Sequence, residues 1–449
     1  MRTLLRGRRY VSRRVEGALL GRPPSSDESG RWRPHAVGCL LVLIIVMGGA
    51  ATAVLKPAAV SADAPLVMSR QSGALFVRID GSLRPVANMA SARLILGTPA
   101  SPRVVDDNSI GPVERGPIVG IAGAPQRIEP PLAPIDVRWT VCENPDGATT
   151  VGISEPGTAT QAANDDAVLA RSSGDGLTYL LYGGRRAVID ITDPAIERTF
   201  RLAGVAAASV SPATLNLLPE VSPIEVPHVP QMGEQSMISP FPNGSILRVD
   251  WAGNVSEYFV VLRDGLQRIG PMAADLVRLA GVHTEIVTVS TDVVVSSPLV
   301  DELQVGTFPD EMSAVSGAGS PVCVQWQGAS TTIVKPDLAR LPDPVKLAQA
   351  DGPGPAIDFV GLPVGRSADV VAVSRDGRGG GEVRYLVTGA GVAFALHDPS
   401  AAAALGLTNS PADMPAALLA GLPAGPELSQ SAALLASDVL GGGIPPPPS

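Results

Sequence analysis

The sequence predicts a β-rich α+β protein in which one transmembrane helix precedes an extracytoplasmic central β domain with four small β-β-α repeat modules in a pseudo-twofold arrangement. The composition is the first reason, because 48 Gly and 43 Pro among 449 residues, with only 17% charged, favour short strands and turns over helical bundles. A long uncharged segment near the N-terminus is the second reason. The third is a strand-turn-strand-helix pattern that recurs along the chain.

The uncharged segment is "AVGCLLVLIIVMGGAATAVL", residues 36–55, between His35 and Lys56. As a helix it is long enough to cross a hydrocarbon layer of about 30 Å. A secretory signal is the alternative, with "VSA" at 60–62 as its cleavage site, but the apolar core of a signal usually has about 7 to 15 residues. Nine arginines lie in residues 1–35, so the positive-inside rule predicts a cytoplasmic N-terminus and a periplasmic location for the bulk of the chain.

The repeat has two classes. The first class is "ALFVRIDGSLRPVANMASARLILG" from Ala74 and "YFVVLRDGLQRIGPMAADLVRLAG" from Tyr258. Each has an apolar strand, a hairpin turn at Asp80-Gly81 or Asp264-Gly265, a second strand, and a helix that Gly97 or Gly281 ends.

The second class begins at Tyr179 and Tyr385, with hairpin turns at Gly183-Gly184 and Gly389-Ala390-Gly391. Both copies place Asp-Pro before the helix, at residues 193–194 and 398–399, where Asp serves as N-cap and Pro as the first helical residue. Each half of the chain therefore carries one copy of each class, which indicates an ancient tandem duplication.

The cysteines fit this duplication. Cys39 lies inside the predicted membrane helix, whereas Cys142 and Cys323 lie in β-prone segments, "RWTVCE" and "VCVQWQ", at similar distances after the two first-class repeats. Two cysteines in an oxidising compartment form a disulfide by default, so we expect a bridge between Cys142 and Cys323 that joins the two halves of a central β domain.

The expected organisation has ten segments. They are a basic cytoplasmic segment (1–35), the transmembrane helix (36–55), the first repeat (56–97), the first half of the central domain (98–177), the second repeat (178–204), a linker (205–245), the third repeat (246–281), the second half of the central domain (282–382), the fourth repeat (383–409), and a C-terminal segment with a Pro-rich tail (410–449).

The sequence predicts no catalytic, cofactor-binding or metal site. The four histidines, at positions 35, 228, 283 and 397, have no further ligands at metal spacing, and the glycine run at 375–385 lacks the phosphate-loop pattern. Adjacent aspartates at 106–107 and 165–166 are more typical of solvated turns than of an acid-base pair. The apolar first strands can line a ligand groove or simply be buried, and the arginines beside the turns can share a polar contact or be solvated. A net charge of −9 argues against a nucleic-acid partner.

Several segments of the chain resemble a known family. The segments "RRVEGAL", "SGALFVRIDG", "NMASARLILGT", "WTVC", "YLLYGGRRAVIDITDPA" and "LPVGRSADVVA" are similar to the EccB family, the single-pass membrane component of the ESX (type VII) secretion systems of mycobacteria and related actinobacteria. The resemblance implies a central domain flanked by four repeats that are likened to a phage-lysin cell-wall-binding fold. It also implies an inner-membrane complex with EccC, EccD and EccE.

Three functions follow from the residues and the resemblance. The preferred function is a structural component of the secretion complex that associates with copies of itself. The first alternative is a peptidoglycan-binding module that anchors the machine. The second is an ATPase, because family members carry that name; ATP is a cofactor only by this family label, since no Walker pattern is present.

Overall fold

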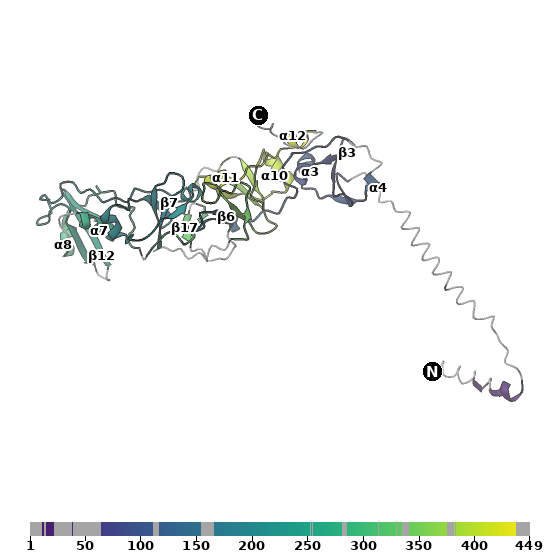
Figure 1. Cartoon of the computed structure of the whole chain (residues 1–449), viewed down its shortest axis with the longest axis horizontal. Coiled ribbons are helices and arrows are strands. Elements are labelled where there is room, and N and C mark those ends of the chain that lie inside the picture. The colour runs from purple at the N-terminus through teal and green to yellow at the C-terminus, as the bar shows by residue number, and fades with distance from the viewer. Residues whose placement is uncertain are drawn as a thin grey trace. The chain divides into compact units, whose positions relative to one another are not determined.

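The computed structural model describes the chain in separate stretches (Figure 1). They are residues 11–12, 15–21, 38, 64–110, 116–153, 166–251, 253, 255–280, 285–312, 314–328, 330–334, 341–374, 381 and 383–436. The chain divides into two compact units, one of Met1–Ala64, Ser69–Gln71 and Val105–Val113, the other of Pro65–Met68, Ser72–Val104 and Glu114–Ser449.

Two sequence predictions fall largely outside these stretches. Of the predicted transmembrane segment only Gly38 is described, and the Pro-rich end of the chain from residue 437 is not. Within the described stretches, no helix combines the length and the apolar character needed to span a bilayer.

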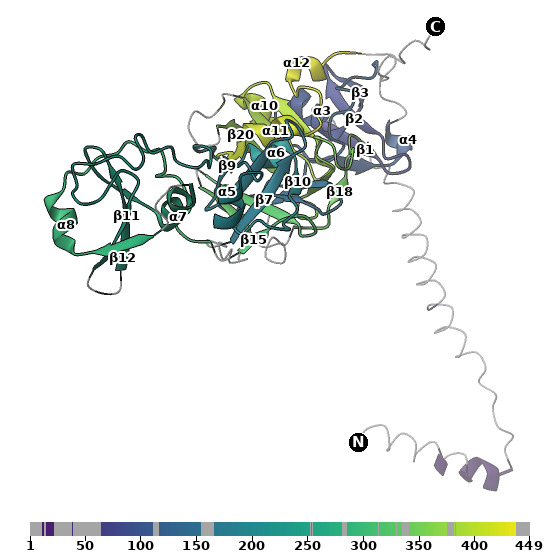
Figure 2. The same ribbon diagram turned by 60° about the vertical axis from the view of Figure 1, so that its left-hand side comes forward.

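The described residues form a β-rich α+β fold built from several small sheets (Figures 1 and 2). The first sheet has the order β3-β2-β1-β4 (Leu66–Ser69, Leu75–Ile79, Ser82–Val86 and Arg103–Val105 for β1 to β4). The second has the order β10-β7-β8-β9, with β15 also on β7 (β7 Asp166–Ser172, β8 Thr178–Tyr182, β9 Arg185–Val188, β10 Ala208–Val210, β15 Ala314–Ser316).

Two further sheets have the same order. The third is β13-β12-β11-β14 (β11 Ile246–Trp251, β12 Val255–Leu262, β13 Gly265–Ile269, β14 Ile286–Val289). The fourth is β22-β21-β20-β23 (β20 Ala368–Val373, β21 Arg384–Val387, β22 Ala393–Leu396, β23 Ala412–Pro415). A central sheet has the order β17-β16-β5-β6-β19-β18 (β5 Trp139–Glu143, β6 Thr149–Ile153, β16 Val322–Gln327, β17 Ser330–Val334, β18 Val345–Lys346, β19 Phe359–Gly361).

One helix follows the hairpin of each four-strand path. These helices are α3 Met89–Leu96, α5 Pro194–Thr199, α7 Pro271–Ala280 and α10 Pro399–Leu405. Shorter helices lie in the connections: α4 Asp107–Ile110, η2 Pro134–Asp136, α6 Pro212–Leu215, α8 Thr291–Ser296, α11 Ala416–Gly421 and α12 Gln430–Ala433.

The connectivity is the same in the second, third and fourth sheets. A first strand pairs antiparallel with a hairpin, a helix follows, and a return strand lies parallel to the first strand, as β10 does on β7, β14 on β11 and β23 on β20. The pattern read from the sequence covers the hairpin and the helix only. A hairpin with one helix buries little apolar surface, and the two added strands supply the rest.

The central sheet unites segments from both halves of the chain. Its strands β5 and β16 are antiparallel neighbours, and Cys142 lies directly opposite Cys323. A disulfide joins these two residues, whose Cα atoms are 4.1 Å apart. One buried core contains Trp139 and Val324 of the central sheet, Leu181 of the second sheet and Val370 of the fourth. The second and fourth sheets therefore pack on the central sheet.

The helices pair the remaining sheets. Helix α3 of the first sheet packs against α10 of the fourth and against α12, as both views show (Figures 1 and 2). Helix α5 of the second sheet packs against α7 of the third, and Leu276 of α7 lies in the core of the second sheet. Each first-class helix thus contacts a second-class helix.

Most predicted turns and caps are confirmed. Asp80 and Gly81 both have positive φ between β2 and β3, as a type I′ hairpin turn requires, and Gly97 ends α3 in the left-handed region. The carboxylates of Asp193 and Asp398 accept hydrogen bonds from the first turns of α5 and α10.

The turn predicted at Asp264-Gly265 is wrong by one residue. The two-residue turn is Arg263-Asp264, because Leu262 pairs with Gly265 in the hairpin. Gly265 is needed for another reason: a Cβ there would lie 2.5 Å from the Pro298 carbonyl oxygen of the segment that covers β13. A close backbone approach, rather than a turn, therefore selects glycine.

The sheets also extend beyond the predicted repeat ranges. Strand β7 lies in the range predicted for the first half of the central domain, and β14 and β20 lie in the range predicted for the second half. The domain boundaries themselves stay predictions.

The disulfide yields the first testable prediction. Replacing both Cys142 and Cys323 by Ala should lower the free energy of unfolding by about 5 kcal/mol in the chain-entropy limit, because the bond closes a loop of 181 residues. The change in free energy is measured by urea unfolding of the detergent-solubilised chain, monitored by tryptophan fluorescence. Trp139 and Trp326 report on it because they face each other across β5 and β16, the two strands that carry the cysteines. Cys39→Ala is the control, and an unchanged urea midpoint for the double variant would contradict the prediction.

Candidate functional site

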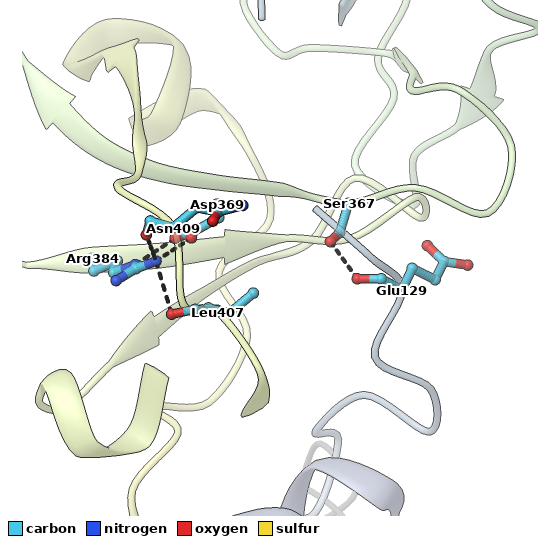
Figure 3. A network of polar contacts seen from close by, with 6 residues as sticks. All are labelled: Glu129, Ser367, Asp369, Arg384, Leu407 and Asn409. Carbon is cyan, nitrogen blue, oxygen red and sulfur yellow. Dashed lines mark hydrogen bonds and ion pairs between the residues drawn. The ribbon is translucent and has the colours of Figure 1, made fainter. Parts of the chain in front are cut away.

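The most connected polar group of the fourth sheet is the guanidinium of Arg384 on β21 (Figure 3). Its Nε donates to Oδ1 of Asp369 on β20 at 2.6 Å, and its Nη2 donates to Oδ2 of the same carboxylate. The same Nη2 also donates to the carbonyl of Leu407 at 3.2 Å and to that of Asn409 at 2.7 Å. Arg384 therefore ties the hairpin to the segment that leads from α10 to β23.

Burial makes this contact energetically important. The Asp369 side chain is only 4% exposed, and that of Arg384 is 21% exposed. A carboxylate taken out of water is costly unless it is paired and hydrogen-bonded, and the planar fork of Arg matches both oxygens. A lysine at position 384 would offer a single nitrogen and would leave part of the carboxylate unsatisfied.

A second contact holds the segment before the central sheet. The Ser367 hydroxyl donates to the Glu129 carbonyl at 2.7 Å, as Figure 3 shows, and the Ser367 N–H donates to the Pro130 carbonyl at 3.1 Å. Arg366 donates from Nη2 to the Pro131 carbonyl at 2.7 Å. The two prolines have no N–H to pair, so their carbonyls are the groups that accept hydrogen bonds from Arg366 and Ser367, the two residues before β20.

A buried carboxylate joins the central sheet to the segment that follows the second sheet. Glu143 on β5 is 1% exposed and accepts from the hydroxyls of Thr149, Ser211 and Thr214 and from the Ser211 N–H. Four donors replace the water that this carboxylate loses. Because Ser211 and Thr214 belong to the N-terminal turn of α6, Glu143 fastens the second sheet to the central one.

Asp358, also 1% exposed, acts within the central sheet. Its Oδ2 accepts from the Thr149 N–H at 2.8 Å and its Oδ1 from the Gly352 N–H at 2.7 Å. The two buried carboxylates thus accept from two different groups of Thr149, Glu143 from its hydroxyl and Asp358 from its N–H.

A tyrosine joins the second sheet to the segment after the third. The Tyr182 hydroxyl donates to the Thr307 carbonyl at 2.6 Å, and burial raises the pKa of Tyr182 to about 12. The hydroxyl therefore stays protonated, and able to donate, through the neutral range of pH.

Near this junction lies a hollow of about 340 Å³ lined by Arg198, Arg201 and Arg278 among others. Arg278 is paired with Asp275 at 3.1 Å. The apolar floor includes Phe200 and Met272. The arrangement gives no acid-base or nucleophilic pair.

Of the sequence candidates, Cys142 and Cys323 are brought together. The arginines beside the hairpin turns are not: Arg186 pairs with Glu220, Arg268 with Glu257, and Arg78 donates to a backbone carbonyl. The hypothesis of one shared contact is therefore wrong for these three. The apolar first strands are buried, as Val77, Leu181 and Val260 illustrate.

The remaining candidates have local partners or lie outside the described residues. In the smaller unit Asp106 pairs with Arg70 at 3.2 Å. His397 Nδ1 lies 2.6 Å from Glu427 Oε1. His35, His283, Asp165 and residues 375–380 of the glycine run are outside the described stretches. Within those stretches, no group of three or more His, Cys, Asp or Glu side chains is placed to hold a metal ion.

Sequence reasoning missed Arg384, Asp369 and Glu143. A charged residue in an otherwise mostly apolar strand is the available signal, since Asp369 is the second residue of "ADVVAV" and Glu143 ends "WTVCE". Such a residue in a buried strand requires a partner, although the sequence does not show which one.

Arg384 yields the second prediction. Arg384→Ala should lower the free energy of unfolding by about 3 kcal/mol or more, because it leaves the Asp369 carboxylate buried and unpaired. Arg384→Lys should recover only part of that loss. Arg268→Ala is the matched control, since its exposed pair with Glu257 should contribute no more than about 1 kcal/mol. Equal losses in the two alanine variants, measured by urea unfolding, would disprove the assigned role.

The chain is similar to known proteins over nearly its whole length. A family model described as type VII secretion system ESX-1, transport TM domain B, matches residues 1–441. The chain is 32% identical to ESX-2 secretion system ATPase EccB2 of Mycobacterium tuberculosis, with 97% of this chain and 94% of that protein covered. It is 30% identical to ESX-5 secretion system ATPase EccB5 of the same species, with 98% and 94% covered.

Solved structures give the same result. A chain of the intact ESX-5 inner membrane complex has a TM-score of 0.73 at 29% identity, with 100% of this chain and 98% of that chain covered. The EccB3 dimer from the ESX-3 core complex has a TM-score of 0.69 at 29% identity, with 83% and 100% covered. The resemblance read from the sequence is confirmed, and the chain belongs to the EccB family of type VII secretion proteins.

Proposed function

We propose that this chain is a structural component of an ESX (type VII) protein secretion complex in the inner membrane and supplies its scaffold and subunit contacts outside the cytoplasm. The observation that carries the proposal is its similarity, over its whole length, to a chain of an intact ESX-5 inner membrane complex. The polar groups of Arg384, Asp369 and Glu143 bind segments of the chain to one another, as expected of a scaffold.

The membrane topology is included in the proposal. Residues 36–55 span the inner membrane once, residues 1–35 lie in the cytoplasm, and the sheets lie in the periplasm. Support comes from the uncharged stretch with its arginine-rich flank and from a similar structure described as the periplasmic assembly of the ESX-5 inner membrane complex.

We also propose that the first to fourth sheets are four copies of one module around a central β domain, in a pseudo-twofold arrangement. The common strand order supports this, and so do the matching helix contacts, α3 with α10 and α5 with α7. The partners we propose are EccC, EccD and EccE subunits and further copies of this chain. The EccB3 dimer of ESX-3 is the observation that favours self-association.

The name ATPase, which the relatives carry, does not enter the proposal. A phosphate loop needs a lysine between Gly and Ser or Thr, and the lysines of this chain, at 56, 335 and 346, all lack that setting. Peptidoglycan binding, the other alternative from the resemblance, stays a prediction.

The test is extraction of the full-length chain from membranes of cells that express the whole secretion system. Mild detergent, native-gel sizing and mass spectrometry of the excised band should show the chain in a large complex with EccC and EccD. A deletion of residues 36–55 should remove the chain from the membrane fraction and from that band. Migration of the intact chain only as a free monomer would overturn the proposal.

A further inference from the structure

The third sheet has one covered edge and one open edge. Along the edge of β13, the Leu266 N–H donates to the Pro298 carbonyl at 2.8 Å, and the Val300 N–H donates to the Leu266 carbonyl at 2.9 Å. At the other edge, β14 pairs with β11. Across the described stretches, no hydrogen bond reaches β14 from any segment other than β11.

The equivalent strands of two other sheets are covered. Strand β23 lies in the central core, and the indole N–H of Trp139 donates to the Asp413 carbonyl at 3.0 Å. Strand β10 contributes Ala208 and Val210 to the same core. In contrast, Ile286 and Val287 of β14 are 36% and 38% exposed. The first sheet differs again, because its return strand β4 is only three residues long and carries the exposed Arg103.

The sequence of β14 gives its edge no protection. Proteins keep exposed edges from pairing with charged side chains, proline, bulges or very short strands. Strand β14 reads Ile-Val-Thr-Val, with neither charge nor proline, and it is regularly paired over its whole length with β11. Val295, on the helix that follows, is 76% exposed and extends the apolar surface nearby.

We propose that β14 pairs with β14 of a second copy of this chain, so that the two third sheets join into one sheet across a twofold axis. The occupant follows from charge and symmetry. A twofold axis perpendicular to the joined sheet, passing beside Val287, makes the two strands antiparallel. It places Val287 opposite Val287 of the second copy and Ile286 opposite Thr288, so these facing pairs are uncharged.

The flanking charge fits the same arrangement. Glu285 precedes the strand, and in this register it faces the uncharged Val289 of the second copy. The two Glu285 carboxylates therefore lie at opposite ends of the paired strands, where they do not repel each other strongly. This inference rests on the self-association in the proposed function and names the surface that performs it.

The experiment uses the full-length chain, extracted in mild detergent, with Cys39→Ser so that the only free thiol is the one introduced. Val287→Cys should be joined to a second copy by a short bismaleimide, giving a band of twice the chain mass. Val364→Cys is the matched control, because Val364 is 95% exposed and lies outside the third sheet. Absence of the double-mass band in Val287→Cys, or its equal yield in the control, would overturn the proposal.

A second variant tests the energy of pairing. Val287→Lys places like charges against each other across the twofold axis and should weaken self-association by about tenfold or more, as measured by sedimentation in detergent. Val287→Thr and Val364→Lys should leave it unchanged, with equal thermal unfolding showing that all three variants fold. Unchanged association in Val287→Lys would disprove pairing through β14. Native gels of the same samples distinguish the two proposals. If the wild-type chain migrates outside the secretion complex, the proposed function is wrong. If the complexes are intact but Val287→Cys gives no crosslink, only the pairing through β14 is wrong.

Discussion

The pairing of β5 with β16 is the contact on which the other sheets depend. It joins two segments from opposite halves of the chain, places Cys142 opposite Cys323, and buries Trp139 and Trp326 side by side. The second and fourth sheets pack on the resulting surface, and each of them in turn presents a helix to its outer neighbour. Loss of register in this one strand pair would move the side chains of both halves to the wrong face.

Polar contacts determine the exact positions of the segments that surround the apolar core. A hydrophobic core tolerates small shifts of the segments around it, since its interactions have no preferred direction. The hydrogen bonds of Glu143, Arg384 and Ser367 are directional. Glu143 binds Ser211, Arg384 binds the Asn409 carbonyl and Ser367 binds the Glu129 carbonyl, so each joins two separate segments of the chain. These residues therefore determine how the sheets sit on the central core.

The sequence predicts the local features well. The caps at Asp193 and Asp398, the turn at Gly183-Gly184 and the end of α3 at Gly97 each depend on a few neighbouring residues. The return strands were missed because "IVTV" or "ASV" is too short to distinguish from a loop, and their partners lie about 40 residues earlier. The Arg384 and Glu143 contacts were missed because no local pattern encodes a partner that only the folded chain brings near. The pair Asp264-Gly265 predicts a turn at Gly265, because these two residues carry no sign of the Pro298 carbonyl that approaches it in the folded chain.

The contacts of α3 have a consequence for the order in which the molecule is completed. Arg93 of this helix donates to the carbonyl of Leu405, and the carbonyl of Ile95 accepts from Gln430, more than three hundred residues later. The first sheet is synthesised early. The side of α3 that contacts α10 and α12 therefore stays exposed until almost all of the chain has been synthesised. Such distant closure is slow, and the exposed helix is a target for chaperones or for premature association during that delay.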